Sequence, residues 1–65
     1  MCEGKNIIIM QGKGGTAYGT DGDDCIFGTS GKDTIKAKAG DDVIVAGKGK
    51  DVVYGGTGNV RAIYA

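Results

Sequence analysis

The sequence predicts an all-β protein, a right-handed parallel β-roll (β-solenoid) of about seven nonapeptide half-coils without caps. Three observations predict it. One nine-residue pattern is written four times without a gap between Gly19 and Tyr54, as GTDGDDCIF, GTSGKDTIK, AKAGDDVIV and AGKGKDVVY. Glycine, aspartate and an aliphatic residue recur at its fourth, sixth and eighth positions. Its last three residues are mostly β-branched or aromatic, which is typical of short strands.

Each copy is predicted to form one tight turn followed by one short strand. Glycine allows the positive φ values that such turns need. Two units complete one coil of a flattened spiral, so alternate strands stack into two parallel sheets and the turns line both edges. Side chains at position eight then fill the interior: Ile26, Ile35, Ile44 and Val53.

The segments on either side follow the same period more loosely. Asn6, Gly15 and Val60 stand where the pattern expects aspartate. We therefore predict a single β-roll domain over residues 1–65, with strong repeats at 19–54 and degenerate ones at 1–18 and 55–65. A phosphate-binding loop at residues 12–16 is disfavoured, because no helix is expected after it.

The composition indicates that something besides a core must stabilise the chain. Its 65 residues bury little apolar surface, and its 14 glycines lose much backbone entropy on folding. With two cysteines and no histidine, a Cys/His zinc site with four ligands is excluded. A disulfide between Cys2 and Cys25, two free thiols and an intermolecular bond through Cys2 all remain open.

Charge and hydropathy narrow the functional classes. Eight acidic and eight basic residues balance, which gives no argument for a nucleic-acid partner. The longest apolar run, Ile7–Met10, is too short for a membrane span or a secretory signal. Without histidine or an activated serine arrangement, the sequence offers no catalytic site, and we expect that the protein is not an enzyme.

The repeated aspartates are the candidate site. Because same-edge turns are two repeats apart, Asp24 is expected beside Asp42, and Asp33 beside Asp51, at roughly one strand separation of 4.8 Å. Carboxylates at this spacing repel unless a cation lies between them. Hard oxygen ligands in flexible glycine turns favour calcium over zinc or magnesium. We therefore predict several Ca²⁺ ions per chain.

The four copies resemble the hemolysin-type calcium-binding nonapeptide repeats of the repeats-in-toxin (RTX) family, whose pattern is G-G-x-G-x-D-x-U-x. The resemblance implies calcium binding by the aspartate and backbone carbonyls of each turn, and a β-roll that forms only with the metal. It carries over four ligands: Asp24, Asp33, Asp42 and Asp51. Weaker candidates are Asn6, Asp21, Asp23 and Asp41. Residues that depart from the pattern are Thr20, Thr29 and Lys38 at position two and Ala37 and Ala46 at position one.

The uncapped repeats predict self-association. An uncapped solenoid exposes strand edges and apolar interior at both ends, which templates further stacking. We expect a structural subunit that folds on Ca²⁺ and stacks end to end with itself into an extracellular or cell-surface filament. The expected interface is Ile7, Ile8, Ile9, Ala62, Ile63 and Tyr64. The alternative is a monomeric calcium-binding RTX module, a secretion or folding aid or an adhesin fragment; type I export is implied by the family resemblance alone.

Overall fold

The computed structural model describes residues 2–64, which form seven strands and no helix. The strands are β1 (Asn6–Ile9), β2 (Gly14–Tyr18), β3 (Asp24–Phe27), β4 (Lys32–Lys36), β5 (Asp42–Gly47), β6 (Val52–Tyr54) and β7 (Val60–Tyr64). Within these described residues there is accordingly no helix that could cross a membrane. The all-β prediction is confirmed.

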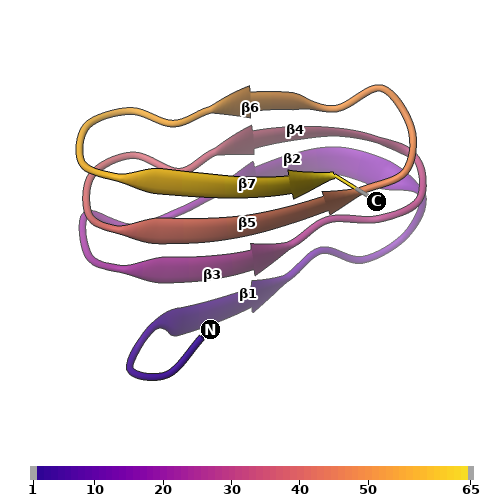
Figure 1. The fold of residues 1–65 in the computed structure, drawn as a ribbon. Coiled ribbons are helices and arrows are strands. Elements are labelled where there is room, and N and C mark those ends of the chain that lie inside the picture. The colour runs from indigo at the N-terminus through magenta and orange to yellow at the C-terminus, as the bar shows by residue number, and fades with distance from the viewer. Residues whose placement is uncertain (1, 65) are drawn as a thin grey trace.

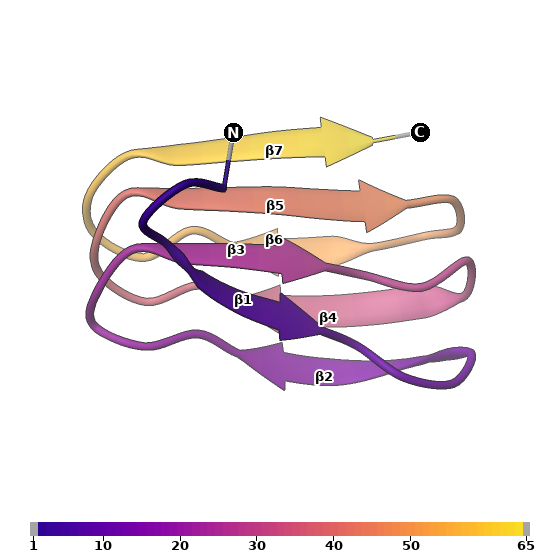
Figure 2. The ribbon, with the colours of Figure 1, turned by 90° about the horizontal axis from the view of Figure 1, so that it is seen from below.

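Odd-numbered and even-numbered strands form separate parallel sheets. One sheet has the order β1-β3-β5-β7 and the other the order β2-β4-β6. The chain runs along one sheet, crosses at a turn, returns along the other sheet and so rises as a right-handed spiral (Figure 1 and Figure 2). The predicted β-roll is therefore present, with one strand for each expected half-coil.

The strands pair in a register of two repeats. Ile26 lies opposite Ile44 between β3 and β5, and Thr34 lies opposite Val52 between β4 and β6. Each position of the nonapeptide therefore stacks on the same position two repeats further along the chain. The register shifts only at the end of β7, where an irregularity pairs Tyr64 with Gly47.

The core lies between the two sheets in the central coils. Position eight supplies its large side chains, and alanines at position one join them. Its fully buried residues are Ile26, Ile35, Ile44, Ala37 and Ala46. At the two ends the position-eight residues Ile8 and Val53 pack against this core but are only partly buried. The apolar core is therefore strongest in the middle of the spiral.

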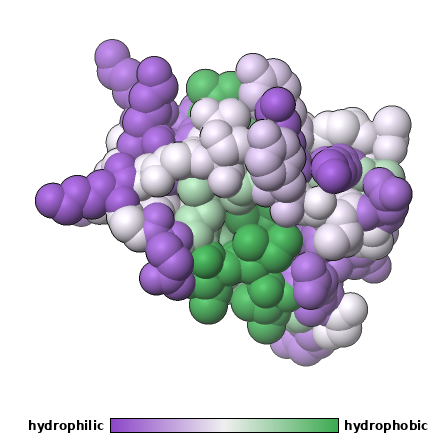
Figure 3. Space-filling model, turned by 180° about the vertical axis from the view of Figure 1, so that it is seen from behind, coloured by the Kyte–Doolittle hydropathy of each residue, from purple (hydrophilic) through white to green (hydrophobic). Residues whose placement is uncertain are grey.

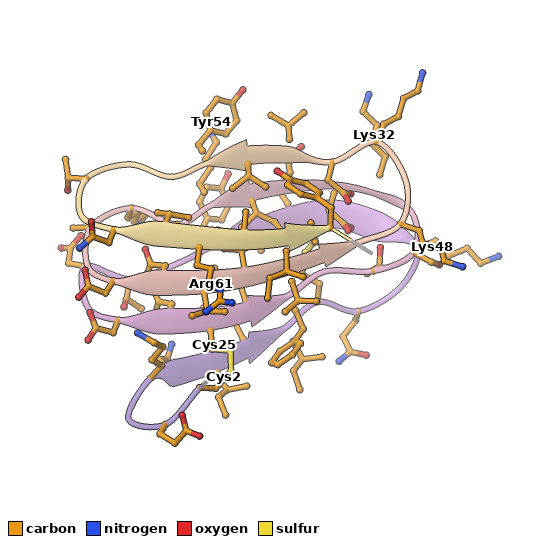
Figure 4. The ribbon with its side chains drawn as sticks, in the orientation of Figure 1. Cys2, Cys25, Lys32, Lys48, Tyr54 and Arg61 are labelled. Carbon is orange, nitrogen blue, oxygen red and sulfur yellow. A yellow bond between two sulfur atoms is a disulfide. The ribbon has the colours of Figure 1, made fainter. Side chains whose placement is uncertain are left out.

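A disulfide bond joins Cys2 to Cys25, with the two Cα atoms 5.7 Å apart (Figure 4). Of the three states that the sequence left open, the structure shows the intramolecular bond. Cys25 lies at position seven of its repeat, so its side chain points away from the core, yet it is fully buried. The disulfide thus ties the segment before β1 to the outer face of β3.

Candidate metal centre

The six-residue turns stack along two edges of the roll that differ in charge. Turns 19–24, 37–42 and 55–60 share one edge with the segment before β1, and turns 10–15, 28–33 and 46–51 share the other. The first, which we call the acidic edge, carries Glu3, Asp21, Asp23, Asp24, Asp41 and Asp42 against Lys5 and Lys38. The second, the basic edge, carries Lys13, Lys32, Lys48 and Lys50 against Asp33 and Asp51. Lys32 and Lys48 project from this basic edge in Figure 4.

Glycines allow successive turns on one edge to approach closely. Gly40 has a φ of 92°, and a Cβ there would collide with the carbonyl oxygen of Gly22 in the preceding turn. On the opposite edge, a Cβ on Gly49 would lie 2.7 Å from the carbonyl oxygen of Gly31. The gaps between stacked turns are therefore lined by backbone carbonyl oxygens, and a side chain at these glycines would fill them.

Two turns are closed by a threonine at position two, and we call them the threonine turns. They are residues 19–24 and 28–33. The backbone N–H of Thr20 donates to Oδ2 of Asp24 (2.8 Å), and its hydroxyl donates to Oδ1 (2.9 Å). Thr29 bonds Asp33 in the same way, at 2.8 and 2.7 Å. Both oxygens of these two buried carboxylates are thus hydrogen-bonded within their own turn.

In the next turn on each edge, the aspartate carboxylate bonds to the preceding turn on that edge and not within its own turn. These turns are residues 37–42 and 46–51. Oδ1 of Asp42 accepts the backbone N–H of Asp24 (2.9 Å), and Oδ1 of Asp51 accepts the backbone N–H of Asp33 (2.9 Å). The second oxygen, Oδ2, of both Asp42 and Asp51 is buried and has no hydrogen-bond partner among the described residues. The predicted pairs are therefore brought together, but their two members have different surroundings.

The residues at positions one and two explain this difference. A threonine turn begins with glycine, and a Cβ on Gly19 would lie only 2.7 Å from Oδ2 of Asp24. The other two turns begin with alanine, and by analogy with Gly19 a methyl group at this position would fill the space that the carboxylate takes in a threonine turn. At position two they have left-handed backbone, with φ values of 64° at Lys38 and 79° at Gly47. We call them the left-handed turns.

The left-handed turns fit a calcium ion. No three acidic or cysteine side chains within residues 2–64 converge on one point, so a cation here needs backbone ligands as well. Calcium takes about six to eight oxygen ligands and accepts backbone carbonyls among them. The unpartnered Oδ2 of Asp42 or Asp51 would supply a carboxylate oxygen beside the carbonyls that line the gap. These turns can therefore offer the hard, flexible ligand set that calcium prefers.

The electrostatic surroundings of Asp42 on the acidic edge also favour a bound cation. Burial raises the pKa of Asp42 above its ordinary value of 3.8, and the negative charges of Asp24 and Asp23 raise it further, against the opposing hydrogen bond from the Asp24 N–H. The ionised form of this carboxyl is thus held in unfavourable surroundings. A bound cation would relieve that penalty.

The weaker candidates make contacts of a different kind. Asn6 donates its side-chain N–H to Oδ1 of Asp24 (3.5 Å). Asp23 and Asp41 lie at position five, where Oδ1 of Asp23 accepts the N–H of Asp41 (2.8 Å) and Oδ1 of Asp41 accepts the N–H of Asn59 (3.4 Å). All three acidic candidates are exposed: Asp21, Asp23 and Asp41. Asp23 and Asp41 thus link successive turns on the outside of the acidic edge.

Sequence reasoning missed two features of the site. The repeat pattern treats Thr20 and Thr29 only as departures at position two, although threonine hydroxyls often form local hydrogen bonds in turns. It also assigned no role to Lys5, whose Nζ donates to the carbonyl oxygen of Asp41 (2.7 Å). Nothing in the repeat pattern indicated that this side chain would reach along the acidic edge.

The comparison with known families agrees with this geometry. Four copies of the RTX calcium-binding nonapeptide repeat match the chain, over residues 16–35 and 27–61. The chain belongs to this RTX repeat family. RTX nonapeptide repeats bind Ca²⁺ in general, the family is structural, and its proteins are generally secreted. Searches of curated proteins and of solved structures each found no match.

Proposed function

We propose that this RTX chain is a structural subunit that folds into its β-roll on binding Ca²⁺ and then joins copies of itself end to end in an extracellular filament. The observation that carries the calcium step is the buried Oδ2 of Asp42 and of Asp51, which has no hydrogen-bond partner among residues 2–64. A buried carboxylate oxygen without a partner costs free energy. Calcium offsets that cost only in the folded state, so binding and folding are coupled.

Strands with one open edge at each end of the described spiral support the stacking step. β1 and β2 each have one neighbour at one end of the spiral, as β6 and β7 do at the other. The expected interface residues are Ile7, Ile8, Ile9, Ala62, Ile63 and Tyr64. Ile7 and Ile9 are 57% and 62% exposed, and a hydrophobic patch lies in the lower part of Figure 3, towards the β1 end of the spiral. Unpaired edges with exposed apolar side chains favour strand addition.

The spiral can continue into a second copy without a change of register. β1 of the next copy would pair with β6, and β2 of the next copy with β7. Asp51 would then lie beside Asn6 of the next copy, and Val60 beside Gly15, so two positions without a carboxylate coincide. An odd number of half-coils turns each copy by half a revolution, with a rise of roughly 17 Å per copy.

Calcium titration of the whole chain tests both steps. Circular dichroism should show a change from coil to β structure at roughly 10⁻⁴ to 10⁻³ M calcium, the affinity range of extracellular calcium modules. Negative-stain electron microscopy should then show fibres. A spectrum that chelator leaves unchanged contradicts the calcium step, and a chain that light scattering finds monomeric at millimolar calcium contradicts the filament.

A matched pair of variants separates folding from stacking. Ala62 is exposed at the open end beside β5, in register with Ile44. Ala62→Lys should keep the calcium-induced β spectrum and abolish fibres, because a charge at this end opposes a dry strand junction. Thr57→Lys, on an exposed turn residue, should retain both. If Ala62→Lys forms fibres as readily as Thr57→Lys, the chain does not stack through this end.

A further inference from the structure

The four repeat aspartates are not equivalent, and we propose that two of them bind calcium while two close their turns without it. The calcium ligands are Asp42 and Asp51. The metal-free pair is Asp24 and Asp33, held by Thr20 and Thr29. This inference rests on the proposed calcium function and deepens it, since it divides the repeats that the family pattern treats alike.

The threonine turns have little capacity left for a metal. Oδ2 of Asp24 accepts the N–H of Thr20 at 2.8 Å, and Oδ1 accepts the Thr20 hydroxyl at 2.9 Å and the Asn6 amide at 3.5 Å. The hydroxyl of Thr20 in turn accepts the N–H of Gly22 at 3.1 Å. A calcium ion that took this carboxylate would compete with the hydrogen bonds that hold the turn closed. In these two turns threonine therefore supplies the contacts to the carboxylate that a metal ion would otherwise make.

The left-handed turns have the opposite arrangement. Asp42 is only 2% exposed, and its Oδ2 has no partner within residues 2–64. Its other oxygen accepts the N–H of Asp24, which holds the carboxylate in the gap between the two turns. Asp51 stands in the same relation to Asp33. A cation can bind these oxygens without breaking a hydrogen bond.

The residues at positions one and two of the repeat together determine whether a turn is of the threonine type or the left-handed type. Glycine followed by threonine lets the carboxylate fold back into its own turn, as at Gly19 and Thr20. Alanine at position one fills that space, as at Ala37, and the left-handed residue after it orients the turn differently. Lys38 is the one non-glycine residue with positive φ in the described part of the chain. That conformation normally costs free energy, so the turn needs a compensating interaction.

The two calcium sites should differ in affinity. The Asp42 site lies on the acidic edge, where the exposed carboxylates Asp23 and Asp41 add negative potential. The Asp51 site lies on the basic edge, in a turn that also contains Lys48 and Lys50. Nearby positive charges disfavour a cation, and salt weakens that effect. The Asp42 site should therefore be the tighter of the two.

Isothermal titration calorimetry with calcium chloride tests the division, with circular dichroism to confirm folding. The wild-type chain should bind two ions. Asp42→Asn should lose the tighter ion and Asp51→Asn the weaker one. The matched controls Asp24→Asn and Asp33→Asn should keep both ions, although at higher half-saturating calcium because their turns are less stable. Four ions in the wild-type chain, or loss of an ion from either control, would overturn the division.

A second test exchanges the residues at positions one and two between the two types of turn and keeps all four carboxylates. Ala37→Gly with Lys38→Thr should convert its turn to the threonine type and remove the tighter ion. Gly19→Ala with Thr20→Gly should convert the opposite way and add a third ion. Unchanged stoichiometry in both double variants overturns the role of these positions. A wild-type chain that binds no calcium overturns the proposed function itself, whereas four equivalent ions overturn only the division.

Discussion

The central and terminal coils of this roll repeat the same unit but are stabilised differently. In β3, β4 and β5 the position-eight isoleucines are fully buried. In β1 and β7 the equivalent residues are Ile8, which is half-buried, and Ala62, which is exposed. Asn6 and Val60 replace the aspartate in those same two coils. The large position-eight side chains are therefore fully buried only where coils cover them on both sides, as expected for a solenoid, whereas the small Ala17 is buried even in the edge strand β2.

The two ends also differ from each other. The coil of β1 is strapped to its neighbours by the Cys2–Cys25 disulfide and by the bond from Lys5 Nζ to the carbonyl oxygen of Asp41. Among the described strands β7 pairs with β5 alone, and its register shifts near Gly47. The first coil is therefore held by contacts that the repeat does not encode, whereas the last coil depends on strand pairing, the turn bond from Asn59 to Asp41 and the partial packing of Val60.

The largest expected effect comes from opening the central core. Ile35→Ala should lower the free energy of unfolding by about 4 kcal/mol, because its side chain is fully buried and leaves a cavity. The terminal counterpart Val53→Ala, which is only partly buried, should cost about 1 kcal/mol. Urea unfolding in saturating calcium measures both. Equal losses would remove the distinction between middle and end.

Removing the N-terminal strap should have the next largest effect. Replacing both Cys2 and Cys25 by alanine should destabilise the calcium-loaded chain by about 3 kcal/mol, because the bond closes a loop with a sequence separation of 23 residues. Thermal unfolding with and without dithiothreitol provides the measurement. The reductant should lower the midpoint of the wild-type chain and leave the alanine variant unchanged; a wild-type midpoint insensitive to reductant would show that the strap contributes nothing.

A smaller effect concerns acid and the Asp42 site. Burial raises the pKa of Asp42, so this carboxyl takes up a proton at a higher pH than an ordinary aspartate does. Calcium needs the ionised form, so affinity should fall as pH decreases through that raised pKa, by about tenfold per pH unit at most for one proton. Calorimetry between neutral pH and pH 4 follows the change. The remaining ion of Asp42→Asn should show a weaker dependence over the upper part of this range; an identical profile would locate the titrating group elsewhere.

Most of the fold could be predicted because the repeat fixes it locally. The side-chain alternation along each strand places position eight inside, and the two-repeat coil sets which aspartates become neighbours. The direction of the Asp42 carboxylate could not be read in this way, because we infer that it depends on the methyl group of Ala37 and on the left-handed backbone of Lys38. The cysteine pairing depends on how the segment before β1 folds back over β3, which no periodic signal describes.

Amide hydrogen exchange followed by NMR tests most directly whether calcium holds the central coils together. The Ala62→Lys variant is suited to it, because this variant is expected to fold without stacking. We predict that calcium slows exchange at the N–H groups of Asp24 and Asp33, which donate to Asp42 and Asp51, more than at amides of β1 and β7, and that chelator abolishes this protection. Equal protection of these amides in calcium and in chelator would contradict the account.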